Sequence, residues 1–140
     1  MTAGVLRVIA PGARSLIQDL GRPGFQRFGV SVSGAMDADA LTLGNRLVGN
    51  QPDSAAIEVT LGGAEFEFLQ AAVFALAGAD FASTLDGLPV PGWQSFAGRA
   101  GARLNLGPAV SGVRGYVCLA GGIATVPVLG SRSTHAASRL

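Results

Sequence analysis

A polar stretch near the start of the chain holds several side chains that could bind or orient an anionic ligand. It runs from Gln18 to Asn50 and includes Asp19, Arg22, Ser33 and Asp37. Asp19 and Arg22 stand three positions apart in a predicted loop, so they could form an ion pair that pins this loop. Alternatively, Arg22 could bind a carboxylate or phosphate through two hydrogen bonds while Asp19 orients it. Both interpretations remain open at this point.

The turn from Ser33 to Met36 comes directly before a predicted helix. Backbone N–H groups at the start of a helix form a favourable environment for an anion, so this turn could bind one. Asp37 is expected to cap the same helix, and its negative charge would repel an anion. The sequence therefore gives Ser33 and its neighbours a structural interpretation as well as a binding one.

A second polar stretch lies near the end of the chain, from Gly130 to Thr134. Arg132 supplies a guanidinium, while Ser133 and Thr134 supply hydroxyl groups, and together they suit a carboxylate, a phosphate or an amide oxygen. The same residues would also suit a polar turn. His135 is the only histidine, and no Gly-x-Ser-x-Gly motif precedes it, so a catalytic triad is not expected.

Four further side chains have both a structural and a functional interpretation. Glu58 lies on the polar face of a predicted strand and could act as a general base, although most such glutamates are solvated. Trp93 and Phe96 could stack on a planar ligand or contact a partner protein. Cys118 lies in an apolar run and is expected to be a buried packing residue rather than a nucleophile.

Composition excludes several classes of function. All ten basic residues are arginine, so the chain cannot carry covalent biotin, form a lysine Schiff base or build a Walker-type phosphate loop. A net charge of +1 without a basic cluster argues against binding to nucleic acid. We expect no metal site, because a single histidine and a distant single cysteine make a poor ligand set.

The apolar character of the chain points to a partner rather than to a membrane. Hydrophobic residues make up 49% of the chain and charged residues only 14%, against about 25% charged in typical soluble domains. The longest apolar runs are short or broken by glycine and proline, so no membrane span is predicted. The single cysteine excludes an internal disulfide and fits a cytoplasmic location. We expect a partner to cover some of the apolar surface.

Alternating patterns predict a single, mainly β domain over residues 1–140. Apolar and polar residues alternate in 57–61, 65–68 and 103–106, which is typical of half-buried strands. Residues 72–77 and 116–120 are apolar on both faces and predict strands inside the wall of a barrel or sandwich. Asp86-Gly87 predicts a two-residue hairpin turn. One short helix is expected, with Asp37 as its N-cap and Gly49-Asn50 at its end.

Several ordered motifs resemble the allophanate hydrolase subunit 2 family, which overlaps the KipA-like proteins, the biotin-dependent carboxyltransferase-like proteins and the C subunits of bacterial 5-oxoprolinases. The motifs that carry the resemblance are residues 15–26, 33–37, 45–50, 57–63 and 129–134. Members are about twice as long as this chain, so the resemblance implies that only the N-terminal half of a two-half protein is present and that a C-terminal half is missing. It also implies a cyclophilin-like β-barrel paired with a KipI-like partner, the B subunit of 5-oxoprolinase.

The first activity that the resemblance implies is that of 5-oxoprolinase. The B and C subunits would activate the lactam carbonyl of 5-oxoproline with ATP, with Mg²⁺ as a possible companion of the nucleotide, and a LamB/YcsF-like A subunit would complete hydrolysis to glutamate. Arg22 or Arg132 would neutralise the substrate carboxylate or the phosphate. Ser133 and Thr134 would hold oxygens, and Asp19 or Asp37, the candidate catalytic carboxylates, would orient groups or accept a proton.

Two other roles fit the same resemblance. In a urea carboxylase or allophanate hydrolase-like system, the pocket would receive carboxybiotin carried by another protein and pass the carboxyl group to urea or a related amide. Because the chain has no lysine, it can take part in that chemistry only with biotin supplied in trans. In a KipA-like role, the domain would be a regulatory binding module without catalytic activity.

Overall fold

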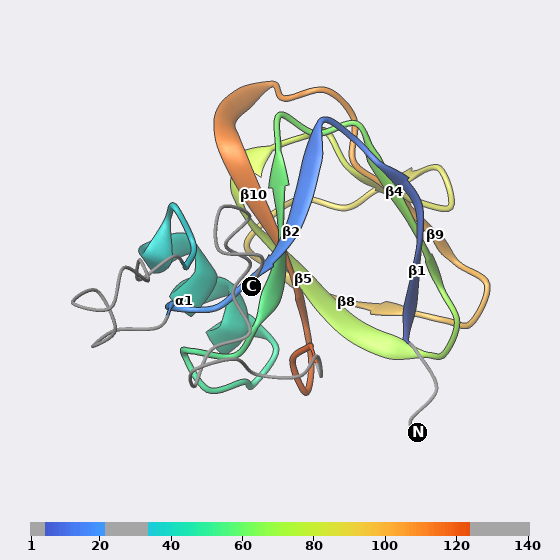
Figure 1. The fold of residues 1–140 in the computed structure, drawn as a ribbon. Helices are drawn as coiled ribbons and strands as arrows, with labels where there is room; N and C mark the ends of the chain where they lie inside the picture. Colours follow the sequence, from blue (N-terminus) through green and yellow to red (C-terminus); the bar gives the residue numbers. More distant parts are fainter. Residues whose placement is uncertain (1–4, 22–33, 124–140) are drawn as a thin grey trace.

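Two antiparallel five-stranded sheets and one helix make up the part of the chain that the computed structural model describes, residues 5–21 and 34–123 (Figure 1). The first sheet contains, in order, β1 (Leu6–Pro11), β4 (Ala64–Phe68), β9 (Arg103–Asn105), β6 (Thr84–Leu85) and β7 (Leu88–Pro89). The second contains β2 (Arg14–Gln18), β3 (Ala56–Thr60), β10 (Ser111–Leu119), β5 (Ala72–Asp80) and β8 (Ser95–Gly98). The expected mainly β class with one helix is confirmed. Closure into a single barrel stays a prediction, because these ladders form two sheets.

The main hydrophobic core lies between the two sheets. In β4, Phe66 and Phe68 are fully buried, while Glu65 and Glu67 alternate with them on the outer side. The second sheet supplies Phe74 from β5 and Val117 from β10. Burying large aromatic side chains removes much apolar surface from water, so this layer contributes most of the hydrophobic stabilisation.

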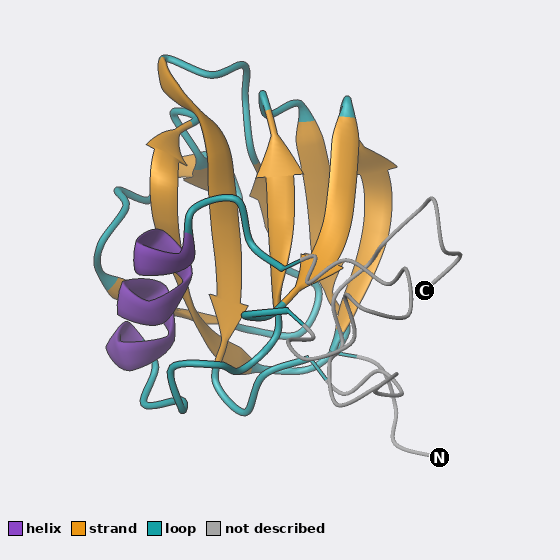
Figure 2. Ribbon diagram, turned by 60° about the vertical axis from the view of Figure 1, so that its left-hand side comes forward, coloured by secondary structure: helices purple, strands orange, loops and turns teal. Residues whose placement is uncertain are grey.

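A second, smaller core lies on the opposite face of the second sheet, under helix α1 (Ala38–Leu47) (Figure 2). Leu41 is buried there against β5 and β10. A Cβ built on Gly44 would lie 2.6 Å from the Cys118 Sγ and 3.0 Å from the Ala77 Cβ. Gly44 therefore lets the helix approach the sheet closely, and the second sheet is covered on both faces.

Two asparagines fix the end of this helix to the sheet. The Asn45 side chain is fully buried and donates to the carbonyl oxygens of Pro52 and Ser54 at 3.1 and 2.8 Å. Asn50 donates to the Asn45 Oδ1 at 3.2 Å and to the Leu119 carbonyl oxygen at 2.7 Å. Residues 45–50, one of the motifs that carried the family resemblance, therefore serve the fold here.

The predicted hairpin turn and helix cap are confirmed, while the strands near the start were missed. Asp86 and Gly87 both have positive φ, 50° and 82°, as a type I′ hairpin requires between β6 and β7. Asp37 caps α1 by accepting the Ala40 N–H at 3.1 Å. Strands β1 and β2 had no prediction, because their exposed and half-buried residues give weak alternation.

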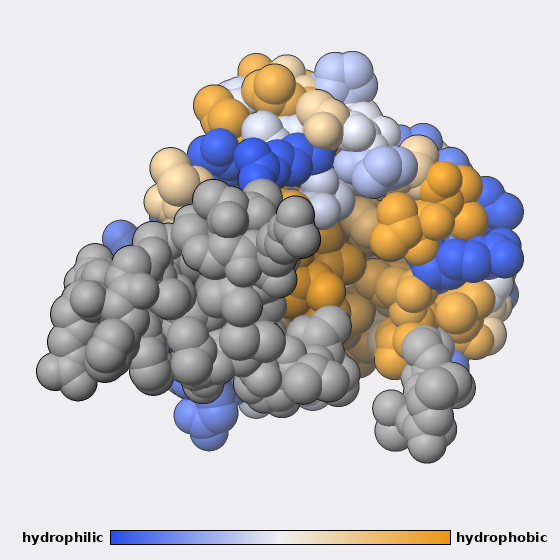
Figure 3. All heavy atoms as spheres, viewed as in Figure 1, coloured by the Kyte–Doolittle hydropathy of each residue, from blue (hydrophilic) through white to orange (hydrophobic). Residues whose placement is uncertain are grey.

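Apolar side chains also remain at the surface. A groove of about 560 Å³ opens between the sheets, where Figure 3 shows a hollow of hydrophobic residues beside the strands of the first sheet. Val8, Leu16, Ile57, Phe66 and Ile123 are among the residues that line it. Within residues 5–21 and 34–123, no helix has the length and apolar character needed to cross a membrane.

Candidate functional site

Of the seven site residues predicted from the sequence, the structure describes Asp19 and Asp37. Asp19 lies where the chain leaves β2, and Asp37 lies where the chain enters α1. The other five lie outside the described residues: Arg22, Ser33, Arg132, Ser133 and Thr134. His135 lies outside them as well. The described part of the site therefore consists of the residues of the first polar stretch on either side of segment 22–33.

Asp19 is buried directly after β2 and shapes the turn that follows. Its Oδ1 accepts the Gly21 N–H at 2.8 Å, and its carbonyl oxygen accepts the Ala35 N–H at 2.9 Å. Gly34 makes the close contact between these two segments possible, since a Cβ there would lie 2.8 Å from the Leu20 carbonyl carbon and 2.9 Å from the Gly21 nitrogen. Its φ of +90° also favours glycine. Segments 19–21 and 34–35 therefore touch through their backbones.

Asp37 follows this contact in the chain and directly precedes α1. Its carboxylate is exposed and caps the helix, while its backbone N–H donates to the Tyr116 hydroxyl oxygen at 3.0 Å. Because the cap occupies one carboxylate oxygen, the main role visible for Asp37 is to begin the helix at a fixed position on the sheet. A proton-accepting role for Asp37 stays a prediction.

Glu58 is the charged centre of the described site, and its environment differs from the one expected. Alternation predicts a solvated face for it, but the side chain is only 4% exposed. Its Oε2 accepts the Tyr116 hydroxyl at 2.5 Å and the Met36 N–H at 2.9 Å. The prediction was wrong because the turn before α1 and the Tyr116 side chain meet the face of β3 that alternation assigns to solvent.

Arg114 completes a group that we call the Glu58–Tyr116 cluster: Glu58, Tyr116, Arg114 and the backbone N–H groups of Met36 and Asp37. The Arg114 Nε donates to the Thr60 Oγ1 at 3.1 Å and lies 3.9 Å from the Glu58 Oε1. Tyr116 and Glu58 are direct partners across β10 and β3. The cluster therefore ties two central strands of one sheet to the turn that begins the helix.

The tyrosine in this cluster is held neutral. Burial raises the pKa of Tyr116 well above its usual value, and the hydrogen bond to Glu58 raises this pKa further. Near neutral pH the phenol therefore stays protonated and donates a hydrogen bond to the Glu58 carboxylate, while its oxygen accepts the Asp37 N–H. This arrangement positions the residues around 34–37. With Glu58 so deeply buried, direct contact with a ligand would require the cover to move.

Sequence reasoning missed Tyr116 and Arg114 because no motif marks them. The only signal was their register opposite Glu58 and Thr60, and a register between strands far apart in the chain cannot be read from alternation. Glu58 is a candidate from the sequence, but as a solvated residue or a base at a barrel mouth.

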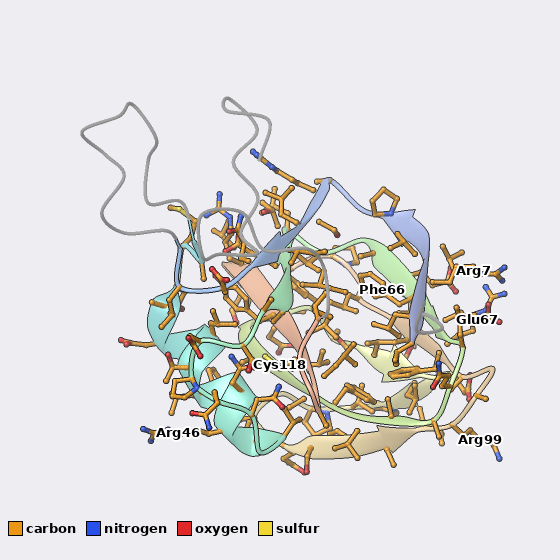
Figure 4. The ribbon with its side chains drawn as sticks, turned by 60° about the horizontal axis from the view of Figure 1, so that its bottom comes forward. Arg7, Arg46, Phe66, Glu67, Arg99 and Cys118 are labelled. Carbon is orange, nitrogen blue, oxygen red and sulfur yellow. The ribbon has the colours of Figure 1, made fainter. Side chains whose placement is uncertain are left out.

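The other three candidate residues from the sequence, Cys118, Phe96 and Trp93, differ in how deeply they are buried. Cys118 is fully buried beneath α1 (Figure 4), and burial raises the pKa of its thiol to about 12, so the expected packing role is confirmed. Phe96 lies in β8 rather than in a loop, and it packs half-buried against the core with its ring centroid 6.1 Å from that of Phe74. Trp93 remains half-exposed beside a cavity.

The amino-acid sequence matches a known protein family over most of its length. Residues 28–140 match the family described as the carboxyltransferase domain, subdomain A and B. The chain belongs to this family, and the resemblance inferred from its motifs is confirmed.

The chain is similar in sequence to several curated proteins. The chain is 43% identical over 131 residues to the 5-oxoprolinase C subunit of Escherichia coli strain K12, covering 93% of this chain and 42% of that protein. It is 42% identical over 130 residues to urea amidolyase of Saccharomyces cerevisiae, covering 92% of this chain and 7% of that protein. The chain thus spans about two fifths of the length of the 5-oxoprolinase protein that it matches.

Solved structures have the same fold. The crystal structure of TTHA0988 superposes with a TM-score of 0.93 at 36% identity, covering 98% of this chain and 52% of that one. The Kluyveromyces lactis urea amidolyase gives a TM-score of 0.90 at 38% identity, covering 93% of this chain and 8% of that one. The architecture of two sheets and one helix is therefore that of the carboxyltransferase-type domain.

Proposed function

We propose that this chain is part of the C subunit of a 5-oxoprolinase-like enzyme, which opens the lactam ring of 5-oxoproline to glutamate at the expense of ATP. The observation that carries the proposal is the identity of 43% and 44% to two 5-oxoprolinase C subunits over most of the chain. In the proposed complex, a KipI-like B subunit completes the site, and a LamB/YcsF-like A subunit takes part in hydrolysis.

The Glu58–Tyr116 cluster has a positioning role in this proposal. It holds the backbone at Met36 and Asp37 by hydrogen bonds of 2.9 and 3.0 Å, and Asp19 holds Ala35 by one of 2.9 Å. Residues 35–37 are thereby held to Asp19 and to the second sheet. A catalytic group must be held within fractions of an ångström of its working position, and buried hydrogen bonds supply that rigidity.

We assign the substrate contacts to residues of the first polar stretch and to the second polar stretch, Gly130 to Thr134. Arg22 or Arg132 neutralises the carboxylate of 5-oxoproline, since a guanidinium can form two parallel hydrogen bonds to it. Ser33, Ser133 and Thr134 hold oxygens of the substrate. Asp19 or Asp37 orients these groups or accepts a proton.

The described residues do not by themselves fit a nucleotide. Asp19, Asp37 and Glu58 bring three carboxylates to this region, and Arg114 is the guanidinium that lies beside Glu58. Triphosphates are bound by N–H groups and cations rather than by carboxylates. We therefore propose that ATP binds to the assembled complex rather than to the described residues alone.

The test is release of glutamate from 5-oxoproline by the full-length C subunit that contains this chain, assayed with its B and A subunits and ATP. Arg22→Ala and Arg132→Ala are each expected to lower kcat/KM at least about tenfold, since a charge-assisted hydrogen bond contributes about 1.5–3 kcal/mol. Arg46→Ala is the matched control, because Arg46 is exposed in the last turn of α1, at the end away from the cluster. Absence of turnover with all three proteins present would reject the proposed activity.

Carboxyl transfer is the second candidate, favoured by the family description and by the match to urea amidolyase. In that reaction the same site receives carboxybiotin on another protein and passes its carboxyl group to urea or a related amide. The test is transfer of labelled carboxylate from a carboxylated biotin carrier to urea by the full-length protein. Transfer in the absence of 5-oxoproline turnover would replace the first proposal by this one.

A further inference from the structure

We propose a second binding site that takes a small planar ring bearing N–H donors and no negative charge, and that adjoins the Glu58–Tyr116 cluster through Tyr116. It is a cavity of about 200 Å³ beside β5, on the side of the loop that follows β7. Its walls come from β5, from the loop at Val90–Trp93 and from Gly115 and Tyr116 of β10. Neither the proposed catalytic roles nor the family assignment uses this cavity.

Trp93 stands at this cavity in a strained backbone conformation. Its φ is +65°, a region that bulky residues avoid, and its backbone N–H donates to the Leu76 carbonyl oxygen at 2.7 Å. A residue held in this region costs on the order of 1–3 kcal/mol, and such strain clusters at functional sites. The indole is 47% exposed, so the strain does not serve burial in the core. It places a large aromatic surface beside the cavity instead.

The size of the cavity suits one ring. A cavity of about 150 Å³ can hold benzene, so about 200 Å³ accommodates a six-membered ring with one small substituent. Gly78, with a φ of +83°, keeps part of the β5 wall free of a side chain. A Cβ there would lie 2.5 Å from the Arg114 carbonyl oxygen and 3.4 Å from the ring of Tyr116.

The polar groups of the lining select the charge of the ligand. Among the described residues that line the cavity, Asp80 has the only formal charge. Its Oδ1 accepts the Ala82 N–H at 2.8 Å, which fixes the carboxylate in place. Ser83, whose hydroxyl can accept or donate, is 7% exposed in the same lining. A ring with N–H donors can hydrogen-bond to both, whereas an anion would face Asp80 without a compensating cation.

Because Trp93 is the only tryptophan, its fluorescence reports this site alone. The probes are benzamidinium and benzoate, two planar rings of similar size and opposite charge, titrated into the full chain with excitation at 295 nm. Benzamidinium should quench or shift the emission saturably with a dissociation constant on the order of 1 mM. Benzoate should bind at least tenfold more weakly.

Asp80→Asn separates the proposed charge selection from simple cavity filling. The amide oxygen can still accept the Ala82 N–H, so the fold should persist, which circular dichroism will verify. Benzamidinium binding should weaken at least fivefold in this variant. Asp86→Asn is the matched control, because Asp86 also accepts a backbone N–H, from Arg103 at 2.8 Å, but does not line the cavity. It should leave binding unchanged.

Three outcomes would overturn the proposal. They are equal binding of benzoate and benzamidinium, no saturable response to benzamidinium up to 20-fold above about 1 mM, and unchanged benzamidinium binding in folded Asp80→Asn. Ligand-observed NMR with Trp93→Leu provides an independent readout, in which benzamidinium saturation transfer should fall. None of these measurements depends on turnover, so a failure here is distinguishable from a failure of the proposed enzymatic function.

Discussion

At the scale of single residues, Glu58 is best understood as a structural acceptor. Its Oε2 receives two donors, from Tyr116 and from the backbone of Met36, in a place with almost no contact with water. In Glu58→Gln, the amide keeps the shape but replaces one acceptor oxygen by a donor. We expect a loss of about 2–3 kcal/mol in the free energy of unfolding, since buried groups lose charge-assisted hydrogen bonds. Urea denaturation measures this loss.

Glu65→Gln is the control for this substitution. Glu65 lies on the outer side of β4, half-exposed, and its carboxylate is 3.6 Å from the Arg103 guanidinium. A surface pair of this kind contributes about 0–1 kcal/mol, so the control should change stability little. Equal effects of the two substitutions would contradict the assignment of Glu58 as a buried anchor.

Tyr116 supplies the pH dependence of the same cluster. Burial and the bond to Glu58 raise the pKa of Tyr116, and burial raises the pKa of Cys118 to about 12. A group whose pKa is raised on folding binds its proton more tightly in the folded state. Its contribution to stability is therefore complete below the unfolded pKa, about 8.5 for cysteine and about 10 for tyrosine, and is lost as pH rises through the folded value.

The expected result is stability that declines above about pH 9. Tyr116 is the only tyrosine, so absorbance at 295 nm reports its ionisation alone. Phenolate should form together with loss of the far-ultraviolet circular dichroism signal. A native protein that ionises Tyr116 near pH 10, with its secondary structure intact, would show that the phenol is accessible and the cluster open.

At the scale of elements, Gly34 decides whether the two segments of the candidate site can cross. In Gly34→Ala, the new Cβ would meet backbone atoms of Leu20 and Gly21 at 2.8–2.9 Å, in addition to the strain of a φ of +90°. We expect destabilisation of more than about 2 kcal/mol, because backbone on both sides must move apart. Urea denaturation, with the glutamate-release assay alongside it, measures the effect.

Gly87→Ala isolates the contribution of backbone strain. Gly87 has a similar φ of +82°, but a Cβ there would meet nothing within 4 Å. Only the cost of the left-handed conformation applies, about 1–2 kcal/mol. If Gly34→Ala cost no more than Gly87→Ala, the close crossing of segments 19–21 and 34–35 would be disproved.

The elements also show where sequence reasoning succeeds. Asp37 and Asp86-Gly87 were identified because capping and hairpin turns depend on residues adjacent in the chain. Glu58 was misplaced because its burial depends on the turn before α1 and on Tyr116, which come from other parts of the chain. Tyr116 was missed because its partner lies 58 positions away. Local chemistry can thus be read from the sequence, while the cover over a strand face depends on tertiary packing.

At the scale of the whole molecule, the two hydrophobic cores share the same strands. In β10, Val117 and Leu119 face the core between the sheets, while Tyr116 and Cys118 face the core under α1. Side chains of a strand alternate between its faces, so unfolding β10 removes packing from both cores at once. We therefore expect the helix layer and the sandwich of sheets to unfold as one cooperative unit.

Gly44→Ala tests this coupling from one side only. Its Cβ would meet the Cys118 Sγ and the Ala77 Cβ, so the direct damage falls on the helix layer, and we expect destabilisation of about 1–3 kcal/mol despite the better helix propensity of alanine. Trp93 fluorescence reports unfolding of the sheets, and alkylation of Cys118 reports opening of the helix layer. Because the cores share β5 and β10, both probes should shift to the same lower denaturant midpoint. Earlier alkylation of Cys118 with unchanged Trp93 fluorescence would instead show that α1 opens independently of the sheets.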